Sequence, residues 1–241
     1  MSMRSSTGAD QTVTVPEATS VNRWERLWRM NGVNVVLFFV AAALVYGSQP
    51  KIGASPAELT AFYDGDRTRI LIAAIIFGLA VLNLMWFASA IRTVLVEAGQ
   101  GGWATSATAS SAAIGGILLL LMAIAASLTY SITGLRGTGL ASGLNDLVWT
   151  GFVLSSFPRA MLVMSGSFGL WRAGIISNGL FTAGVACVIL GVLGGTTWAT
   201  DGFWAPDGAY SQYVWPVIFL VWILVVTGIL ARQRSSTREG W

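Results

Sequence analysis

Six long apolar segments dominate this sequence and constrain its fold more than any other feature. They lie at about 31–48, 69–92, 111–132, 145–170, 174–197 and 213–232. A helix needs about 20 apolar residues to cross the ~30 Å hydrocarbon core of a bilayer, and each segment is close to that length. The sequence therefore predicts an all-α, polytopic transmembrane bundle of about six helices.

The low charge of the chain also indicates a membrane protein. Of the 241 residues, 54% are hydrophobic and only 10% are charged, whereas a soluble domain carries about 25% charged residues. There is too little charge to cover a water-facing surface of this size. We therefore expect a multi-pass protein of the cell membrane.

The positions of the basic residues predict the orientation. With the N-terminus in the cytoplasm, nine basic residues fall on the cytoplasmic side and four on the outer side. Positive charge is enriched on the cytoplasmic side of membrane proteins, so we expect both termini to be cytoplasmic. The cytoplasmic set is Arg4, Arg23, Arg26, Arg29, Arg92, Arg172, Arg232, Arg234 and Arg238, and the outer set is Lys51, Arg67, Arg69 and Arg136.

The chain divides into four regions. Residues 1–20 are polar and are expected to form a disordered cytoplasmic tail, and residues 233–241 form a second tail. Residues 21–30 place Trp24 and Trp28 on one helical arc and arginines on the rest. This pattern predicts an interfacial amphipathic helix on anionic lipid, or a partner-binding helix. Residues 31–232 form the six-helix transmembrane domain.

Several connections carry local signals. Ser55, Pro56 and Glu58 match a capping box with proline in the first turn and predict a short helix over 56–63. Asn145 is expected to cap the start of the fourth segment, and the negative charge of Asp146 is expected to interact favourably with the dipole of that helix. The Gly- and Ser-rich stretch 98–110 is expected to be a loop.

The charged residues after the short helix have two interpretations, a solvated local cluster or a small extracytoplasmic recognition site. They are Asp64, Asp66, Arg67 and Arg69.

Small residues at four-residue spacing predict helix–helix packing, because helices in lipid associate through close contacts. The fifth segment carries the longest ladder. Internal packing is the first interpretation, and a homo-oligomeric interface is the alternative. The ladder is Ala183, Cys187, Gly191 and Gly195, and the shorter pairs are Ser111–Gly115, Ala112–Gly116 and Ser165–Gly169.

Arg159 lies midway along the fourth segment, where a charge is costly and must face the bundle interior or water. Pro158 cannot donate a backbone hydrogen bond, and the hydroxyls of Ser155 and Ser156 can bond to nearby carbonyls. The sequence predicts a kinked, hydrated point in this helix. Asn83 is a candidate neutral partner of the arginine.

The role of Arg159 is open at this stage. No acidic residue lies in the middle of any segment, and Asp146 is about 20 Å away along the same helix. The guanidinium is either a structural group that bonds to carbonyls and Asn83 or snorkels to an interface, or an anchor for an anionic headgroup or carboxylate.

Other classes of site lack their residues. The chain has no histidine and a single cysteine, Cys187, so we expect no metal site and no cofactor. The basic residues do not form a clustered patch, so nucleic-acid binding is not expected. Neither a nucleophile with its base nor a converging pair of carboxylates is evident, so no catalytic residue is assigned.

Three stretches resemble bacterial six-helix integral membrane proteins that are classed only as a domain of unknown function. They are SPAELTAFYDGDRTRI, the apolar run to Trp86–Arg92, and FPRAMLVMSGSFGLWRAG with the helix after it. The resemblance implies a fold and a location in the bacterial inner membrane, and no activity.

The sequence leads to three functional hypotheses. The first is a protein that binds or moves an amphipathic or lipid-like anionic ligand through Arg159, Asn83, Ser155 and Ser156, with membrane lipid as its partner. The second is a non-catalytic accessory subunit that contacts a partner membrane subunit or a copy of itself. The third is a membrane enzyme.

Overall fold

The computed structural model describes residues 28, 30–134, 139–195 and 199–232. This part of the chain is helical and contains no strand. The predictions for both tails, and most of the prediction for 21–30, lie outside the described residues.

The helices follow one another with short connections. They are α2 (Asn31–Tyr46), α3 (Pro56–Tyr63), α4 (Arg67–Glu97), α5 (Gly101–Ser131), α6 (Leu140–Leu154), α7 (Ser156–Arg172), α8 (Asn178–Gly194), the 3₁₀ turn η1 (Gly202–Trp204), the π-helical turn η2 (Tyr210–Val214) and α9 (Trp215–Arg232).

Four apolar helical stretches are long enough to cross a membrane. They are α4, α5, the pair α6–α7 taken together, and η2 with α9. The helices α2 and α8 are also apolar but shorter, with 16 and 17 residues. The prediction of an all-helical protein with several apolar helices of membrane-spanning length is therefore confirmed.

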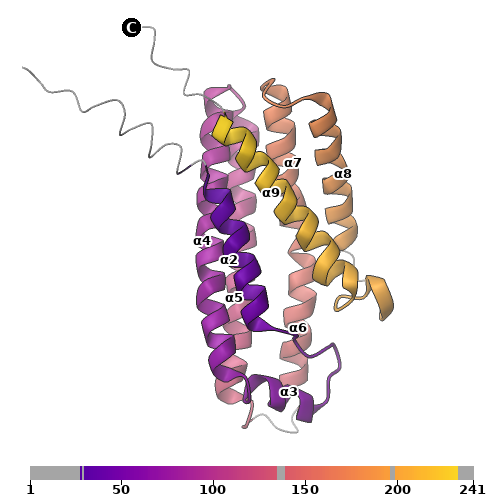
Figure 1. Cartoon of the computed structure of the whole chain (residues 1–241). Coiled ribbons are helices and arrows are strands. Elements are labelled where there is room, and N and C mark those ends of the chain that lie inside the picture. Colours follow the sequence, from indigo (N-terminus) through magenta and orange to yellow (C-terminus); the bar gives the residue numbers. More distant parts are fainter. Residues whose placement is uncertain (1–27, 29, 135–138, 196–198, 233–241) are drawn as a thin grey trace, which may run out of the picture.

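The long helices form an antiparallel row, with α4 beside α5 and α5 beside the α6–α7 pair (Figure 1). Glycines allow close contact along this row. Gly115 of α5 lies against Val81 of α4, and Gly151 of α6 lies against Leu121 of α5. The helices α2 and α8 pack on the two ends of the row, against α4 and α7.

The last helix, α9, crosses the row diagonally (Figure 1). At its start, Trp215 packs against Gly191 of α8. Halfway along, Trp222 Nε1 donates a 3.1 Å hydrogen bond to Ser167 Oγ of α7. Near its end, Thr227 lies against α2. The helix α9 therefore contacts both outer helices of the row, α8 at its start and α2 near its end.

The small-residue ladder of α8 packs inside the bundle, except at its first residue. Gly191 and Gly195 are buried against Trp215 and Phe157, and Cys187 is half-buried against the core. Ala183, however, is exposed, and Gly184 takes its place against α7. The cause is the 3.6-residue helical period, since a strict four-residue ladder drifts around the helix over three turns.

The short helix α3 forms as the sequence predicts. Ser55 Oγ accepts a hydrogen bond from the Glu58 backbone, and the Glu58 carboxylate accepts one from the Ser55 backbone. Pro56 occupies the first turn. The buried face of α3 places Leu59, Phe62 and Tyr63 against the bundle.

Two predictions about helix ends were wrong. The helix α6 begins at Leu140 after Gly139, which adopts φ of 70°, so Asn145 lies inside the helix and does not cap it. The stretch 98–110 is also mostly helical, because α5 begins at Gly101. Ala104 and Ala107 of this stretch are buried in the core, and that packing outweighs the low helix propensity of its glycines.

Candidate functional site

The site around Arg159 begins with a break in one of the four long apolar helical stretches. The helix α6 ends at Leu154 and α7 begins at Ser156, with Ser155 between them. Pro158 has no N–H to donate to the Leu154 carbonyl, so the regular ladder stops here. The Ser155 hydroxyl donates a 2.6 Å hydrogen bond to the carbonyl of Phe152. This interruption lies where the sequence predicts an irregular point in the helix.

The Arg159 guanidinium closes this break from the α7 side. Its Nη2 donates to the Phe152 carbonyl at 2.7 Å and to Ser155 Oγ at 2.6 Å. Its Nε donates to the Ser155 carbonyl at 3.2 Å, and a longer bond of 3.5 Å joins Nη2 to Ser156 Oγ. The last carbonyls of a helix lack intrahelical donors, so Arg159 serves as a side-chain cap for the end of α6.

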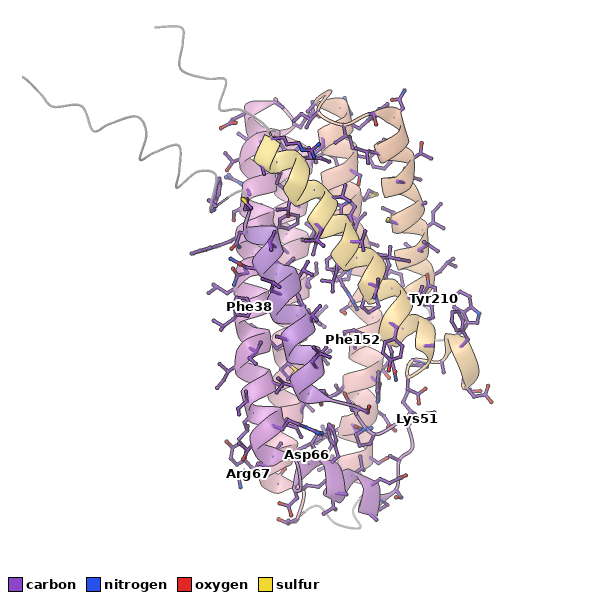
Figure 2. The ribbon with its side chains drawn as sticks, in the orientation of Figure 1. Phe38, Lys51, Asp66, Arg67, Phe152 and Tyr210 are labelled. Atoms are coloured by element: carbon purple, nitrogen blue, oxygen red, sulfur yellow. The ribbon has the colours of Figure 1, made fainter. Side chains whose placement is uncertain are left out.

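Arg159 is buried, with a relative exposure of 4%. Its guanidinium carbon lies 4.6 Å from the centroid of the Phe152 ring, which is a cation–π contact. Phe152 itself lies in the middle part of the bundle (Figure 2). The charge is therefore held away from both ends of the bundle.

The charge of Arg159 has no acidic partner in the described part of the chain. The one ion pair there joins Arg69 and Asp66 at the far end of the bundle. No described residue accepts a hydrogen bond from Nη1 of Arg159. Carbonyls, hydroxyls and the ring lower the cost of burial, but none supplies a negative charge.

The structure does not bring Asn83 to Arg159. The Asn83 amide donates to the Leu79 carbonyl one turn earlier in α4, and its backbone carbonyl accepts a 2.8 Å hydrogen bond from Asn31. Asn83 therefore belongs to the contact between α2 and α4. Of the four candidate ligand residues, Ser155, Ser156 and Arg159 form one cluster.

A second buried polar cluster, centred on Asn145 of α6, was missed by the sequence analysis. Asn145 is fully buried, and its Nδ2 donates to the carbonyls of Pro50 and Lys51, both at 3.2 Å. Its Oδ1 accepts hydrogen bonds from Gln49 at 3.1 Å and Tyr63 at 3.0 Å. The asparagine thus uses both ends of its amide to hold the connection between α2 and α3.

Neighbouring residues of α6 strengthen this attachment. Trp149 Nε1 donates a 2.8 Å hydrogen bond to the Pro50 carbonyl, and the Asp146 carboxylate accepts one from the Gly53 backbone at 3.1 Å. Burial raises the pKa of the Tyr63 hydroxyl above its ordinary value, so the group stays protonated and donates. Residues 49–53 are therefore bound to the bundle.

The charged residues after α3 interact locally. Arg69 forms an ion pair with Asp66 at 2.6 Å, and the guanidinium carbon of Arg67 lies 4.3 Å from the Tyr130 ring centroid. Asp66 and Arg67 lie at the end of the bundle that carries α3 (Figure 2). These contacts lie between neighbouring residues and an aromatic ring, as expected for a local charge cluster.

Comparison with known proteins gives no assignment, since no family model, curated protein or solved structure matches this chain.

Proposed function

We propose that this is a multi-pass membrane protein that binds an anionic, lipid-like molecule at Arg159. The observation that carries the proposal is the buried guanidinium of Arg159, 4% exposed, with no carboxylate partner in the described chain. A buried charge in a membrane helix is costly, and an anion at Nη1 would compensate it.

The geometry also determines how such a ligand would bind. Nη2 and Nε are occupied by Phe152 and Ser155, so Nη1 is the nitrogen that remains for a phosphate or carboxylate oxygen. Only 4% of Arg159 is exposed, so a bound ligand would be largely enclosed by the surrounding helices. We therefore expect slow exchange, with the ligand retained through purification.

The proposed arrangement in the membrane has six crossings with both termini in the cytoplasm. The helices α2, α4, α5, α8, the α6–α7 pair and η2 with α9 would each cross once. At about 1.5 Å per residue, α2 and α8 reach ~24–26 Å. Local bilayer thinning accommodates such a mismatch. Trp28, which packs on the core, supports an extension of the first crossing before Asn31.

Three variants of Arg159 test the proposal by native mass spectrometry in mild detergent, combined with analysis of the extracted lipid. Arg159→Gln keeps hydrogen-bond donors but removes the charge, so it should fold and lose the anionic ligand. Arg159→Lys keeps the charge without the planar fork and should retain part of the ligand. Arg92→Gln, at an exposed arginine of α4, is the matched control.

Two outcomes would overturn the proposal. One is wild-type protein that carries no anionic molecule. The other is a folded Arg159→Gln variant that carries as much of it as the wild type. In either case Arg159 serves only as the cap of α6, and unfolding of Arg159→Leu would then measure that structural role.

The accessory-subunit hypothesis loses one of its supports. Gly191 of α8 and Gly195 directly after it, which were candidates for a partner interface, are buried against Trp215 and Phe157 of the same chain. Ala183 remains on the exposed side of α8. A membrane enzyme has no further support from the described residues.

A further inference from the structure

An open groove of about 400 Å³ lies between α5 and α7, at the opposite end of the bundle from α3. On one side it is lined by residues 99–102 and by Trp103 and Ser106 of α5. On the other side it is lined by Met161 and Arg172 of α7. Its size is in the range of ligand-binding pockets.

The groove follows the axis of α7. Met161 and Arg172 are eleven residues apart, a spacing that returns to the same helical face after three turns. The rise of an α-helix places them about 16 Å apart along the axis. One end of the groove therefore carries the apolar thioether of Met161, and the other carries the guanidinium of Arg172. An amphiphilic molecule lying parallel to the helices would match this arrangement.

An aromatic cluster places the Arg172 end at the level of lipid headgroups. Trp171 stacks on Phe181 with ring centroids 4.4 Å apart, and its Nε1 donates to Asn178 at 2.9 Å. Trp103 and Phe168 lie 5.4 Å apart between their centroids. Tryptophan rings with a polar edge favour the membrane–water interface.

The groove has a positive charge and no negative one. Arg172 is exposed, and it forms no ion pair and donates no hydrogen bond to a described residue. No aspartate or glutamate is among the lining residues. A phosphate oxygen beside Arg172 would complement this charge.

We propose that this groove binds an anionic phospholipid. Arg172 contacts the headgroup phosphate, and one acyl chain passes Trp103 and reaches Met161. This site is separate from Arg159, which is thirteen residues away from Arg172 on the same helix and points into the core. The inference therefore holds whether or not Arg159 binds a ligand.

The test measures binding of phosphatidylglycerol and of phosphatidylcholine with matched chains to the full-length protein, by native mass spectrometry in a zwitterionic detergent. Arg172→Gln should weaken phosphatidylglycerol binding by about tenfold, the effect of one lost charge-assisted hydrogen bond. Phosphatidylcholine shares this phosphate but carries a choline cation beside it, so its binding should be weaker in the wild type and should fall less in the variant. Arg172→Lys should show a smaller loss, and Arg92→Gln should leave this site intact.

A second variant fills the groove and leaves Arg172 in place. A side chain at Gly102 would meet no other atom within 4 Å of its Cβ, so Gly102→Leu should fold normally and exclude the acyl chain. Gly78→Leu, at an equally open position on α4, is the control. Excess inorganic phosphate should not displace the lipid; if it does, the site takes a free anion and the lipid proposal is wrong. Wild-type affinity in both Arg172→Gln and Gly102→Leu would also overturn it.

Discussion

The Tyr63 hydroxyl of α3 donates a 3.0 Å hydrogen bond to Oδ1 of Asn145 in α6, and both residues are fully buried. This bond joins the short helix α3, between α2 and α4, to a buried position of α6. The connection between α2 and α4 is therefore part of the folded core.

Replacing Asn145 should destabilise the protein more than replacing any one of its hydrogen-bond partners. Asn145→Leu leaves the Tyr63 hydroxyl, the Gln49 amide and the carbonyls of Pro50 and Lys51 without this partner. A buried unsatisfied group costs about 1–3 kcal/mol, so the expected loss in the free energy of unfolding is about 3 kcal/mol or more.

Denaturant unfolding in detergent measures this loss. Tyr63→Phe removes one of the hydrogen bonds and should cost less. Asn34→Leu, at an exposed asparagine of α2 whose amide donates one 3.2 Å hydrogen bond to Asn31, is the control and should cost less than Asn145→Leu. Equal stability of Asn145→Leu and Asn34→Leu would show that the cluster contributes nothing.

The capping box should make α3 sensitive to acid. Hydrogen bonds from the backbone and side chain of Ser55 lower the pKa of Glu58 from its ordinary value of 4.5. A depressed pKa in the folded state means that the contribution is fully present above the ordinary value and is lost as the pH falls through the lowered one. An NMR titration of the Glu58 carboxyl should place its midpoint below 4.5. Ser55→Ala should raise that midpoint, and an unchanged midpoint would contradict the capping box.

Two glycine-to-alanine changes should have opposite effects. A Cβ at Gly191 would lie 2.5 Å from the Trp215 ring and 2.9 Å from Ala160 Cβ, so Gly191→Ala forces α8 away from α7 and α9. Overpacking of this kind costs about 1–3 kcal/mol. Gly228→Ala, in α9, meets no atom within 4 Å and should gain up to about 1 kcal/mol of helix propensity. Thermal unfolding should rank Gly191→Ala below wild type and Gly228→Ala at or above it. A gain for both variants would rule out the close contact.

The single cysteine makes the proposed orientation testable by thiol labelling. In a Cys187→Ser background, Lys51→Cys in the α2–α3 connection and Glu97→Cys at the end of α4 place thiols at exposed positions at opposite ends of the bundle. An impermeant maleimide added to intact cells should label position 51 and not position 97, and lysis should expose both. The reverse pattern would show that the orientation is inverted.

Local signals in the sequence predicted local structure well. The Ser55–Glu58 capping box and the proline-marked break before Arg159 depend on residues within one or two turns, so both can be identified in the sequence. Asn145 could not be interpreted in this way, because its partners at residues 49–51 and Tyr63 are distant in sequence. The partner of Asn83 was missed for the same reason, since it depends on how α4 is rotated against α2.

Every hydrogen bond that the Arg159 side chain makes in the described chain reaches back no further than Phe152, seven residues earlier. A charged segment that needed a distant helix to bond it would enter the bilayer with its full desolvation cost. Here the compensating carbonyls and hydroxyls become available as soon as residues 152–159 are helical. The α6–α7 stretch therefore carries the hydrogen-bond partners of its own arginine, whichever helices later pack around it.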